Sequence, residues 1–358
     1  MLKKLDWYIV RKFLTTFVVA IVLIILIVIV FDVSEKLDDF ISSQAPLRLI
    51  IFQYYVNFIP YFVNLFSHLF VFVAVIFFTS KLASHTEIIA MLASGISFRR
   101  LLYPYIFASL LIAGLNFVFS NWVIPKVNQG RIAFEQEYVR NARHYWRNIH
   151  IQPTANTQVY VSTFDKLKNT GFSFTYEEFT PQNLALKITA DRIEYDTVAC
   201  RWTLFDYTKH KVSGLSETLV SGDSMLLDFH LEPKDFAENS HNIQTMNYQE
   251  LNAYIKQERS RGSTYVITYL VEKYQRLFNP IAIVILTIMG VALSSRKSRR
   301  GTGAHLGIGI SLAFCFIVLM KIVTVFSTKG NLPPLISVLI PPVLFSIITF
   351  FLVRNTPK

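Results

Sequence analysis

Six runs of apolar residues dominate the sequence, and each is long enough to cross the roughly 30 Å hydrocarbon layer of a membrane as a helix. The runs form two groups of three, separated by a polar stretch from Pro125 to about Tyr274. The pattern therefore predicts an α-helical membrane protein with six transmembrane helices, three on each side of one large insert. The predicted spans are residues 13–31, 58–79, 101–124, 277–293, 306–326 and 335–353.

The insert between the third and fourth spans has the composition of short β-strands. Its apolar runs are rich in Val, Ile, Thr and aromatic residues, and Gly, Asn, Asp or Pro separates them. Even spacing of such strands favours an all-β sandwich, jelly roll or barrel over βαβ units. The predicted strands are "TQVYVSTFD", "GFSFTYEEF", "LALKITADRIEYD", "RWTLFDYTKHKV" and "SMLLDFHL".

Two helical segments, residues 125–141 and 247–278, flank the predicted strands. In the second segment, Asn247 precedes Glu250 by three residues, which is the spacing of a capping box at a helix N-terminus. The chain is therefore expected to divide into a first transmembrane half (residues 1–125), the β insert with its flanking segments (126–276) and a second transmembrane half (277–358).

Lysine and arginine residues in the short connections predict the orientation, because they gather on the cytoplasmic side of a membrane. They concentrate in the N-terminal tail, in the loops after the second and fourth spans, and in the C-terminal tail, which all lie on one side. Both termini are therefore expected in the cytoplasm and the insert outside. The run at residues 13–31 is too long for a signal peptide and is interpreted as a retained anchor.

The composition agrees with a membrane protein that has a substantial aqueous part. Of the 358 residues, 52% are hydrophobic and 16% are charged. The net charge of +11 is attributed to cytoplasmic helix ends. Nucleic-acid binding is not expected, because no basic stripe with interleaved aromatic residues lies outside the loops. Cys200 and Cys315 lie in different layers of the predicted topology, so a disulfide between them is not expected.

Sequence motifs for common enzymatic sites are absent from the chain. It has no GxxxxGK[ST] nucleotide loop, no HExxH and no GxSxG. His68 lies inside the second span, where an ionisable group is a functional candidate. The simpler interpretation is a neutral histidine hydrogen-bonded to a neighbouring helix. A membrane-anchored enzyme and a receptor with an outer ligand-binding domain both remain as alternative classes.

The connection "ASHTEIIAMLASGISFRR" at residues 83–100 contains a short predicted helix, at about residues 84–95. Ser84 and Glu87 have capping-box spacing, and Gly95 suits the position just after the helix. Ser97 is expected to cap the next helix, which would begin at Phe98. A helix of about ten residues is unstable alone in water and needs a surface. The residues leave two surfaces open, the lipid interface and a groove on a cytoplasmic partner.

Four segments resemble one known family, the lipopolysaccharide-export permeases LptF and LptG. The resemblance spans almost the whole chain, although the insert matches only in size and β character. Its Glu-apolar-apolar-Ala-Met motif lies in the connection at residues 83–100. The matching segments are "LDWYIVRKFL", "TEIIAMLASGISFRRLL", "NPIAIVILTIMGVALSSRKSRRG" and "LPPLISVLIPPVLFSIITFFLVR".

The resemblance implies a subunit of an ABC transporter in the bacterial inner membrane. A paralogous permease would be its partner, and a cytoplasmic ABC ATPase dimer would bind ATP and Mg²⁺, so that no cofactor is expected on this chain. The insert would be a periplasmic β-jellyroll that passes lipopolysaccharide to a bridge protein of similar fold. A single-span periplasmic regulator is a further implied partner.

The resemblance also assigns the helix at residues 84–95 as the coupling helix that docks into the ATPase. The candidate ATPase-coupling residues are Ser84, Glu87, Ile88, Met91, Leu92, Gly95, Arg99 and Arg100. Glu87 is the expected polar contact to the ATPase, whereas the two arginines could equally reach lipid phosphates.

Basic residues near the outer membrane face are candidates to hold the anionic lipid head group. They are Lys36, Arg48, Lys321 and Lys329. A local salt bridge to a neighbouring acidic residue is the alternative role for Lys36. For Lys321, the alternative is a side chain that extends to the membrane interface.

Overall fold

The computed structural model describes residues 3–139, 145–154, 156–165, 168–180, 183–197, 199–213, 216–227, 231–236, 243–260, 263, 265–295 and 302–356. The chain forms two compact units. The first consists of Met1–Ile41, Pro46–Arg131 and Ile267–Lys358, and the second of Ser42–Ala45 and Ile132–Val266.

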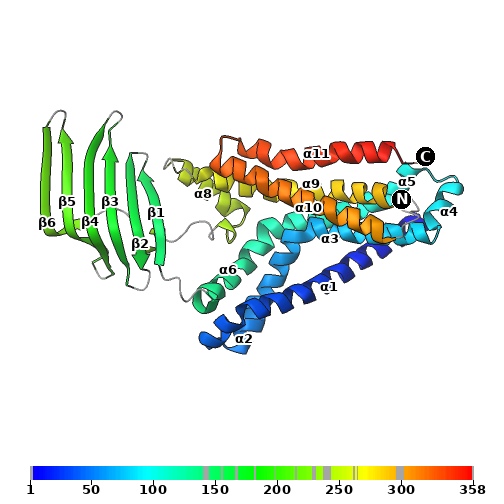
Figure 1. Ribbon diagram of the computed structural model, residues 1–358, viewed down its shortest axis with the longest axis horizontal. Coiled ribbons are helices and arrows are strands. Elements are labelled where there is room, and N and C mark those ends of the chain that lie inside the picture. Colours follow the sequence, from blue (N-terminus) through cyan, green and yellow to red (C-terminus); the bar gives the residue numbers. More distant parts are fainter. Residues whose placement is uncertain are drawn as a thin grey trace. The chain divides into compact units, whose positions relative to one another are not determined.

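Among the described residues, six long helical segments are apolar enough to cross a membrane. Each contains one of the predicted spans, which confirms the arrangement of three helices before the β region and three after it (Figure 1). The first is α1 (Lys4–Ser42), and the second joins α2 (Leu47–Leu49), η1 (Ile50–Tyr55) and α3 (Val56–Ser84). The third joins α5 (Phe98–Val118), η2 (Phe119–Val123), α6 (Ile124–Phe134) and η3 (Glu135–Val139). The others are α9 (Val266–Ser294), α10 (Thr302–Lys329) and α11 (Pro334–Arg354), and α4 (Glu87–Ala93) is a short helix between α3 and α5.

Several helices extend well beyond the apolar runs that predicted them, whereas α11 exceeds its run by one residue at each end. Helix α1 has 39 residues, which corresponds to a length of about 58 Å at 1.5 Å per residue. Its polar last part, residues 32–42, continues as helix, with Asp32 and Lys36 paired across one turn. Hydropathy therefore located each span but underestimated the length of its helix.

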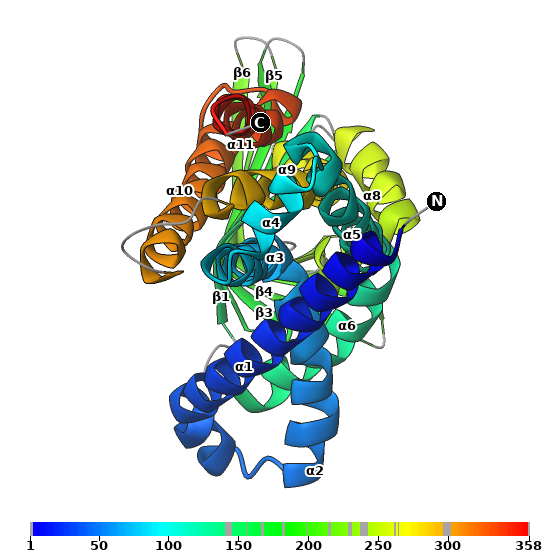
Figure 2. The same ribbon diagram turned by 90° about the vertical axis from the view of Figure 1, so that its right-hand side faces the viewer.

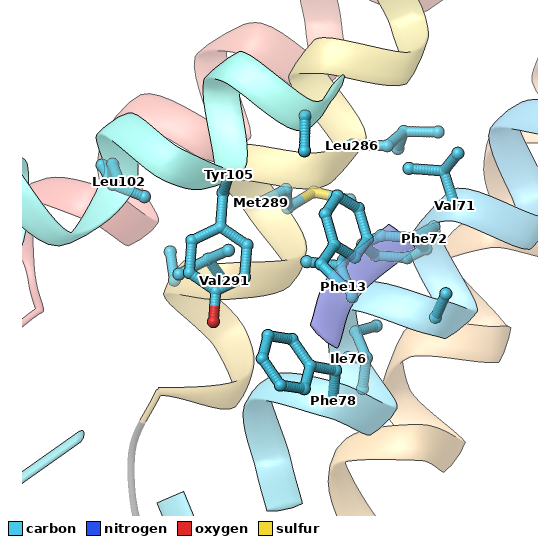
Figure 3. Packing of buried hydrophobic residues seen from close by; sticks show 14 of the residues in the cluster. Phe13, Val71, Phe72, Ile76, Phe78, Leu102, Tyr105, Leu286, Met289 and Val291 are labelled. Carbon is cyan, nitrogen blue, oxygen red and sulfur yellow. The ribbon is translucent and has the colours of Figure 1, made fainter. Parts of the chain in front are cut away.

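The hydrophobic core of the first unit gathers side chains from α1, α3, α4, α5, α9, α10 and α11 (Figure 3). Phe13 of α1 lies with its ring centre 5.9 Å from that of Tyr105 of α5. The Thr79 hydroxyl donates to the Tyr105 hydroxyl oxygen across 3.2 Å, which ties α3 to α5. Both termini and α4 lie at one end of this unit (Figure 1), which faces the viewer in Figure 2. Ile88 of α4 and Ile9 of α1 belong to the core, so the core continues from this end into the long helices.

A polar network joins α3 to α5 and η2 inside the apolar bundle. The Asn116 side-chain amide donates to Asn64 Oδ1 across 2.9 Å and to Ser67 Oγ across 2.7 Å. The Asn64 amide in turn donates to Ser120 Oγ across 2.9 Å. Hydrogen bonds between transmembrane helices hold neighbouring segments in one register, because lipid offers no alternative partner.

The second unit contains one antiparallel sheet of six described strands in chain order. They are β1 (Tyr145–Thr154), β2 (Thr157–Asp165), β3 (Thr170–Phe179), β4 (Leu184–Asp196), β5 (Arg201–Ser213) and β6 (Ser216–Leu227). Four of them match predicted strands. The sequence missed β1 altogether. The predicted last strand, residues 224–231, overlaps β6 at residues 224–227, but its predicted start was wrong, because β6 begins at Ser216. Residues 228–230 lie outside the described residues.

One face of the sheet is apolar and is covered by the segment that follows β6. Phe236 of η4 (Pro233–Phe236) stacks on Phe164 with ring centres 4.9 Å apart. The Trp202 indole donates to the Leu231 carbonyl oxygen across 2.8 Å. Within the described residues this segment, and no second sheet, covers the apolar face. The all-β insert is confirmed, and the jellyroll connectivity stays a prediction.

Helix α8 (Tyr248–Ser260) begins at the predicted capping box. The Asn247 side chain accepts from the backbone N–H of Glu250 across 2.9 Å, and the Glu250 carboxylate accepts from the Asn247 N–H across 2.8 Å. Both bonds are those that define the motif, so this prediction is confirmed.

Candidate functional site

Helix α4 starts differently from the sequence prediction. It begins at Glu87 after Thr86, which has a φ of 60° and makes no side-chain cap. Ser84 is instead the last residue of α3, and its hydroxyl donates to the Lys81 carbonyl oxygen across 2.8 Å. The predicted Ser84–Glu87 capping box was therefore wrong, because α3 continues to Ser84 and uses its hydroxyl within its own last turn.

The other end of α4 follows the sequence prediction. Gly95 has a φ of 88°, and its N–H bonds to the Leu92 carbonyl oxygen across 3.1 Å. The N–H of Ile96 reaches the Met91 carbonyl oxygen across 3.3 Å, which completes a Schellman motif. Ser97 then caps α5 by accepting from the Arg100 N–H across 3.3 Å. Four residues, 94–97, therefore separate α4 from α5, and these bonds fix the direction of α4 relative to α5.

We expect Gly95→Val to destabilise the end of α4 by about 1–2 kcal/mol, because left-handed backbone is unfavourable for a side chain with a Cβ. An added Cβ would meet nothing within 4 Å, so the effect is confined to the backbone. Thermal unfolding of the purified protein measures it. Gly95→Asn is the matched control and should retain more stability, since asparagine tolerates this conformation. Equal losses in the two variants would contradict this explanation.

The inner side of α4 is held by the core, whereas its outer side is open. Ile88 is 1% exposed and belongs to the core of the first unit. Met91 and Leu92 are half-buried against the same core. The side chains of Ile89, Ala90 and Ala93 are exposed. Of the predicted coupling residues, Ile88, Met91 and Leu92 therefore position the helix, and its free surface is small and mostly apolar.

Two polar contacts connect the start of α1 to α4 and α5. The Tyr8 hydroxyl donates to Glu87 Oε2 across 3.2 Å. Arg100 Nη2 contacts Asp6 Oδ2 at 2.6 Å, and the same oxygen accepts from the Lys3 backbone N–H across 2.7 Å. Glu87 is thus half-buried and oriented by Tyr8, and its second oxygen retains capacity to accept further hydrogen bonds.

Sequence reasoning missed both Asp6 and Tyr8. Their partners lie 94 and 79 residues further along the chain, so no local spacing connects them. One signal was present, because Asp6 is the only acidic residue among the first 31 and stands between basic residues. Of the two predicted arginines, Arg100 pairs with Asp6, and Arg99 is exposed.

At its other end, α1 meets η1 and α3 through a compact polar cluster. Lys36 Nζ lies 2.6 Å from Asp32 Oδ1, and it also donates to the Tyr54 hydroxyl. The Tyr55 hydroxyl donates to Asp32 Oδ2 across 3.0 Å. The Lys36 ammonium lies 4.6 Å from the centre of the Tyr54 ring and 5.7 Å from that of Phe58. Lys36 therefore has the local salt bridge that was its alternative role, and its charge is balanced within the fold.

The three remaining basic candidates, unlike Lys36, have exposed side chains. Arg48 lies in α2, and Lys321 and Lys329 lie in α10. All three side chains are exposed, and none forms a salt bridge with another described residue. No hydrogen bond or ion pair within the described chain links any two of the four candidates, so the structure does not assemble them into one site.

The middle of α1 is exposed between its two polar attachments. Its exposed side chains are large and apolar, namely Val18, Val19, Val22, Leu23, Leu26, Ile27, Val30 and Phe31. Such a surface suits lipid or another transmembrane helix.

His68 packs against the ring edge of Phe316, with ring centres 5.6 Å apart. Its Nε2 is buried and has no hydrogen-bond partner among the described residues, so the predicted bond to a neighbouring helix is not seen. No group of three His, Cys, Asp or Glu residues within the described chain has metal-site geometry.

Comparison with known proteins gives one match that covers nearly all of these features. A family model described as "Lipopolysaccharide export system permease LptF/LptG" matches residues 7–355. A search of curated proteins found no match. The matched range includes α4, the Tyr8–Glu87 contact, the Lys36 cluster and the whole β sheet, and it begins one residue after Asp6.

Proposed function

The chain belongs to the LptF/LptG family of lipopolysaccharide export permeases, and from this premise we propose how it works. As a multi-pass membrane protein it is the transporter component of the export system. Our proposal is that a separate cytoplasmic ABC ATPase supplies the energy, and that α4 receives it. The chain would then extract lipopolysaccharide from the inner membrane and pass it to a periplasmic bridge.

The single observation that carries this proposal is the two-sided packing of α4. Its inner side chain Ile88 is locked into the core, while the small side chains Ala90 and Ala93 are exposed beside Ile89. A short helix with an open apolar side fits a groove on a partner. Ile88 belongs to the same hydrophobic core as side chains of α1, α3 and α5, so we expect displacement of α4 to be passed to these helices.

The proposed orientation of the protein in the membrane rests on the distribution of lysine and arginine residues. Both termini lie at the same end as α4 (Figure 1). The N-terminal tail and the chain on either side of α4 carry basic residues, namely Lys3, Lys4, Lys81 and Arg99. We assign this end to the cytoplasm, because short cytoplasmic loops are enriched in lysine and arginine. The β unit is then periplasmic, and ATP and Mg²⁺ would bind on the partner ATPase.

The proposed assembly contains a second, paralogous permease, and the exposed apolar side of α1 gives it a surface to pack against. At the outer end, the exposed cations Arg48, Lys321 and Lys329 would attract the anionic lipid head group. Lys36 would contribute only if the head group competes with Asp32 for it. A bridge protein and a single-span regulator complete the proposal.

We expect Glu87→Ala to uncouple ATP hydrolysis from lipid export, because Glu87 is the polar group on the docking helix. The measurement is ATP-driven lipopolysaccharide release from vesicles that contain the permease pair and its ATPase, with ATP hydrolysis followed in parallel. Glu35→Ala, at an exposed carboxylate in the outer half of α1, is the matched control. Normal export by Glu87→Ala would overturn the role of Glu87. Failure of any ATPase to copurify with the chain would overturn the proposed function itself.

A further inference from the structure

A pocket of about 490 Å³ with a mixed polar and apolar lining lies on the face of the sheet opposite its apolar core. Its floor comes from β1 to β4, and Ser263 and Tyr265 line its wall. The size falls within the range of small-molecule sites, which is roughly 300–1,000 Å³. Every lining residue belongs to the second unit.

The strand register explains why these side chains converge. His150, Tyr160 and Thr175 stand directly opposite one another on β1, β2 and β3. In the next row, Gln158, Glu177 and Lys187 are opposite one another on β2, β3 and β4. Residues opposite one another across a sheet share one face. Two rows of polar side chains therefore form one continuous floor.

The charges of the pocket cancel. Lys187 Nζ lies 2.9 Å from Glu177 Oε1, so the one lysine of the lining already has a carboxylate partner. A phosphate would have to compete with Glu177 for this cation. An acyl chain is equally unsuited, because it would leave the polar groups of the floor without partners.

The remaining groups of the lining are uncharged and suit a ligand that carries many hydroxyls. The rings of His150 and Tyr160 lie with centres 4.7 Å apart, and Tyr265 is 48% exposed at the wall. Tyrosine offers a rigid amphipathic surface, and amides and hydroxyls both donate and accept hydrogen bonds. A sugar presents the matching chemistry, with C–H faces to lie on the rings and hydroxyls for Gln158 and Thr175.

We infer that this pocket is a saccharide-binding subsite, which holds the carbohydrate part of the exported lipopolysaccharide. The inference rests on the proposed function, because the name of the family supplies a substrate with both lipid and sugar. The polar outer face receives the sugar, so recognition of the carbohydrate is separated from the transmembrane helices that would handle the lipid.

The test is titration calorimetry on the full-length protein in detergent. The probe is the lipid-free oligosaccharide released from lipopolysaccharide by mild acid, and the sugar-poor lipid A from the same cleavage is the second probe. We expect the oligosaccharide to bind the unaltered chain, and Gln158→Ala and Tyr160→Ala to weaken it about tenfold or more. Thr208→Ala, in the same row as Tyr160 but outside the pocket, is the control.

Tyr160→Phe keeps the ring and removes only the hydroxyl, so it distinguishes stacking on the ring from hydrogen bonding to the hydroxyl. It replaces Tyr160→Ala in the test if that variant does not fold. Absence of oligosaccharide binding, or equal binding by Gln158→Ala and Thr208→Ala, would overturn the inference. Binding of lipid A that is lost in the pocket variants would also overturn it. A chain that binds oligosaccharide here but never exports lipid with an ATPase would refute the proposed function and leave the subsite standing.

Discussion

Asp6→Ala is expected to destabilise the first unit by about 1–3 kcal/mol, since hydrogen bonds to charged groups contribute about 1.5–3 kcal/mol and solvent screening reduces that value. The Asp6 side chain is 5% exposed and accepts from both Arg100 and the Lys3 backbone N–H. Its removal leaves the Arg100 guanidinium, which is 33% exposed, without a carboxylate and frees the first turn of α1. We expect the loss of these contacts at the start of α1 to account for most of the reduction in lipid export.

The connection matters because α1 is attached to the described part of the first unit mainly near its ends. Near its start, Asp6 binds Arg100 and Tyr8 binds Glu87, while Ile9, Val10 and Phe13 enter the core. Loss of Asp6 would remove the ion pair between α1 and α5 and leave Tyr8 and the core side chains to hold α1 there, so motion of α5 would be passed to α1 less fully. We therefore expect Asp6→Ala to reduce lipid export more strongly than it reduces ATP hydrolysis.

Thermal unfolding and vesicle export measure the two parts of this prediction. The swap of Asp6→Arg with Arg100→Asp should recover part of both losses, because it restores an ion pair at the same place. Asp38→Ala, at an exposed carboxylate in the outer half of α1, serves as the control. Unchanged stability and export in Asp6→Ala would show that the ion pair has no mechanical role.

Local sequence patterns predicted the caps of the helices only where the preceding chain was free to adopt them. Asn247 and Glu250 form the expected capping box because no helix precedes Asn247 directly. Ser84 has the same spacing to Glu87, but it still belongs to α3, and Thr86 takes the left-handed conformation instead. The spacing of two residues carries no information on whether an earlier helix has ended.

The membrane topology was predictable because the hydrocarbon layer demands long apolar runs, and the sequence contains six of them. The attachments of α1 were not predictable from the same pattern. Tyr54 and Asp32 are 22 residues apart, and Tyr8 and Glu87 are 79 residues apart. Such pairs depend on how whole helices pack. The missed strand β1 shows the same limit, since its place beside β2 comes from pairing along the sheet.

Gly290→Leu is expected to destabilise the first unit by overpacking the contact between α9 and α3. A Cβ at Gly290 of α9 would press on Val75 of α3 and lie 3.2 Å from two ring carbons of Phe72. Gly309 of α10 meets Ile76 of α3 in the same way. Helix α3 is thus approached closely by two helices, and small residues in membrane helices permit this approach. Overpacking such a contact costs about 1–3 kcal/mol and sometimes more.

Gly114→Leu isolates the packing effect, because a Cβ at Gly114 of α5 would meet nothing within 4 Å. Both substitutions replace glycine inside a helix and share a gain in helix propensity of about 1 kcal/mol, so the difference between them measures packing alone. Thermal unfolding in detergent gives that difference, and Val75→Ala should rescue Gly290→Leu by removing the side chain that it strikes. Equal unfolding temperatures for Gly290→Leu and Gly114→Leu would mean that α3 and α9 can separate without loss. A force received at α4 would then have no rigid path into the membrane, because α3 transmits displacement only if its neighbours hold it in place.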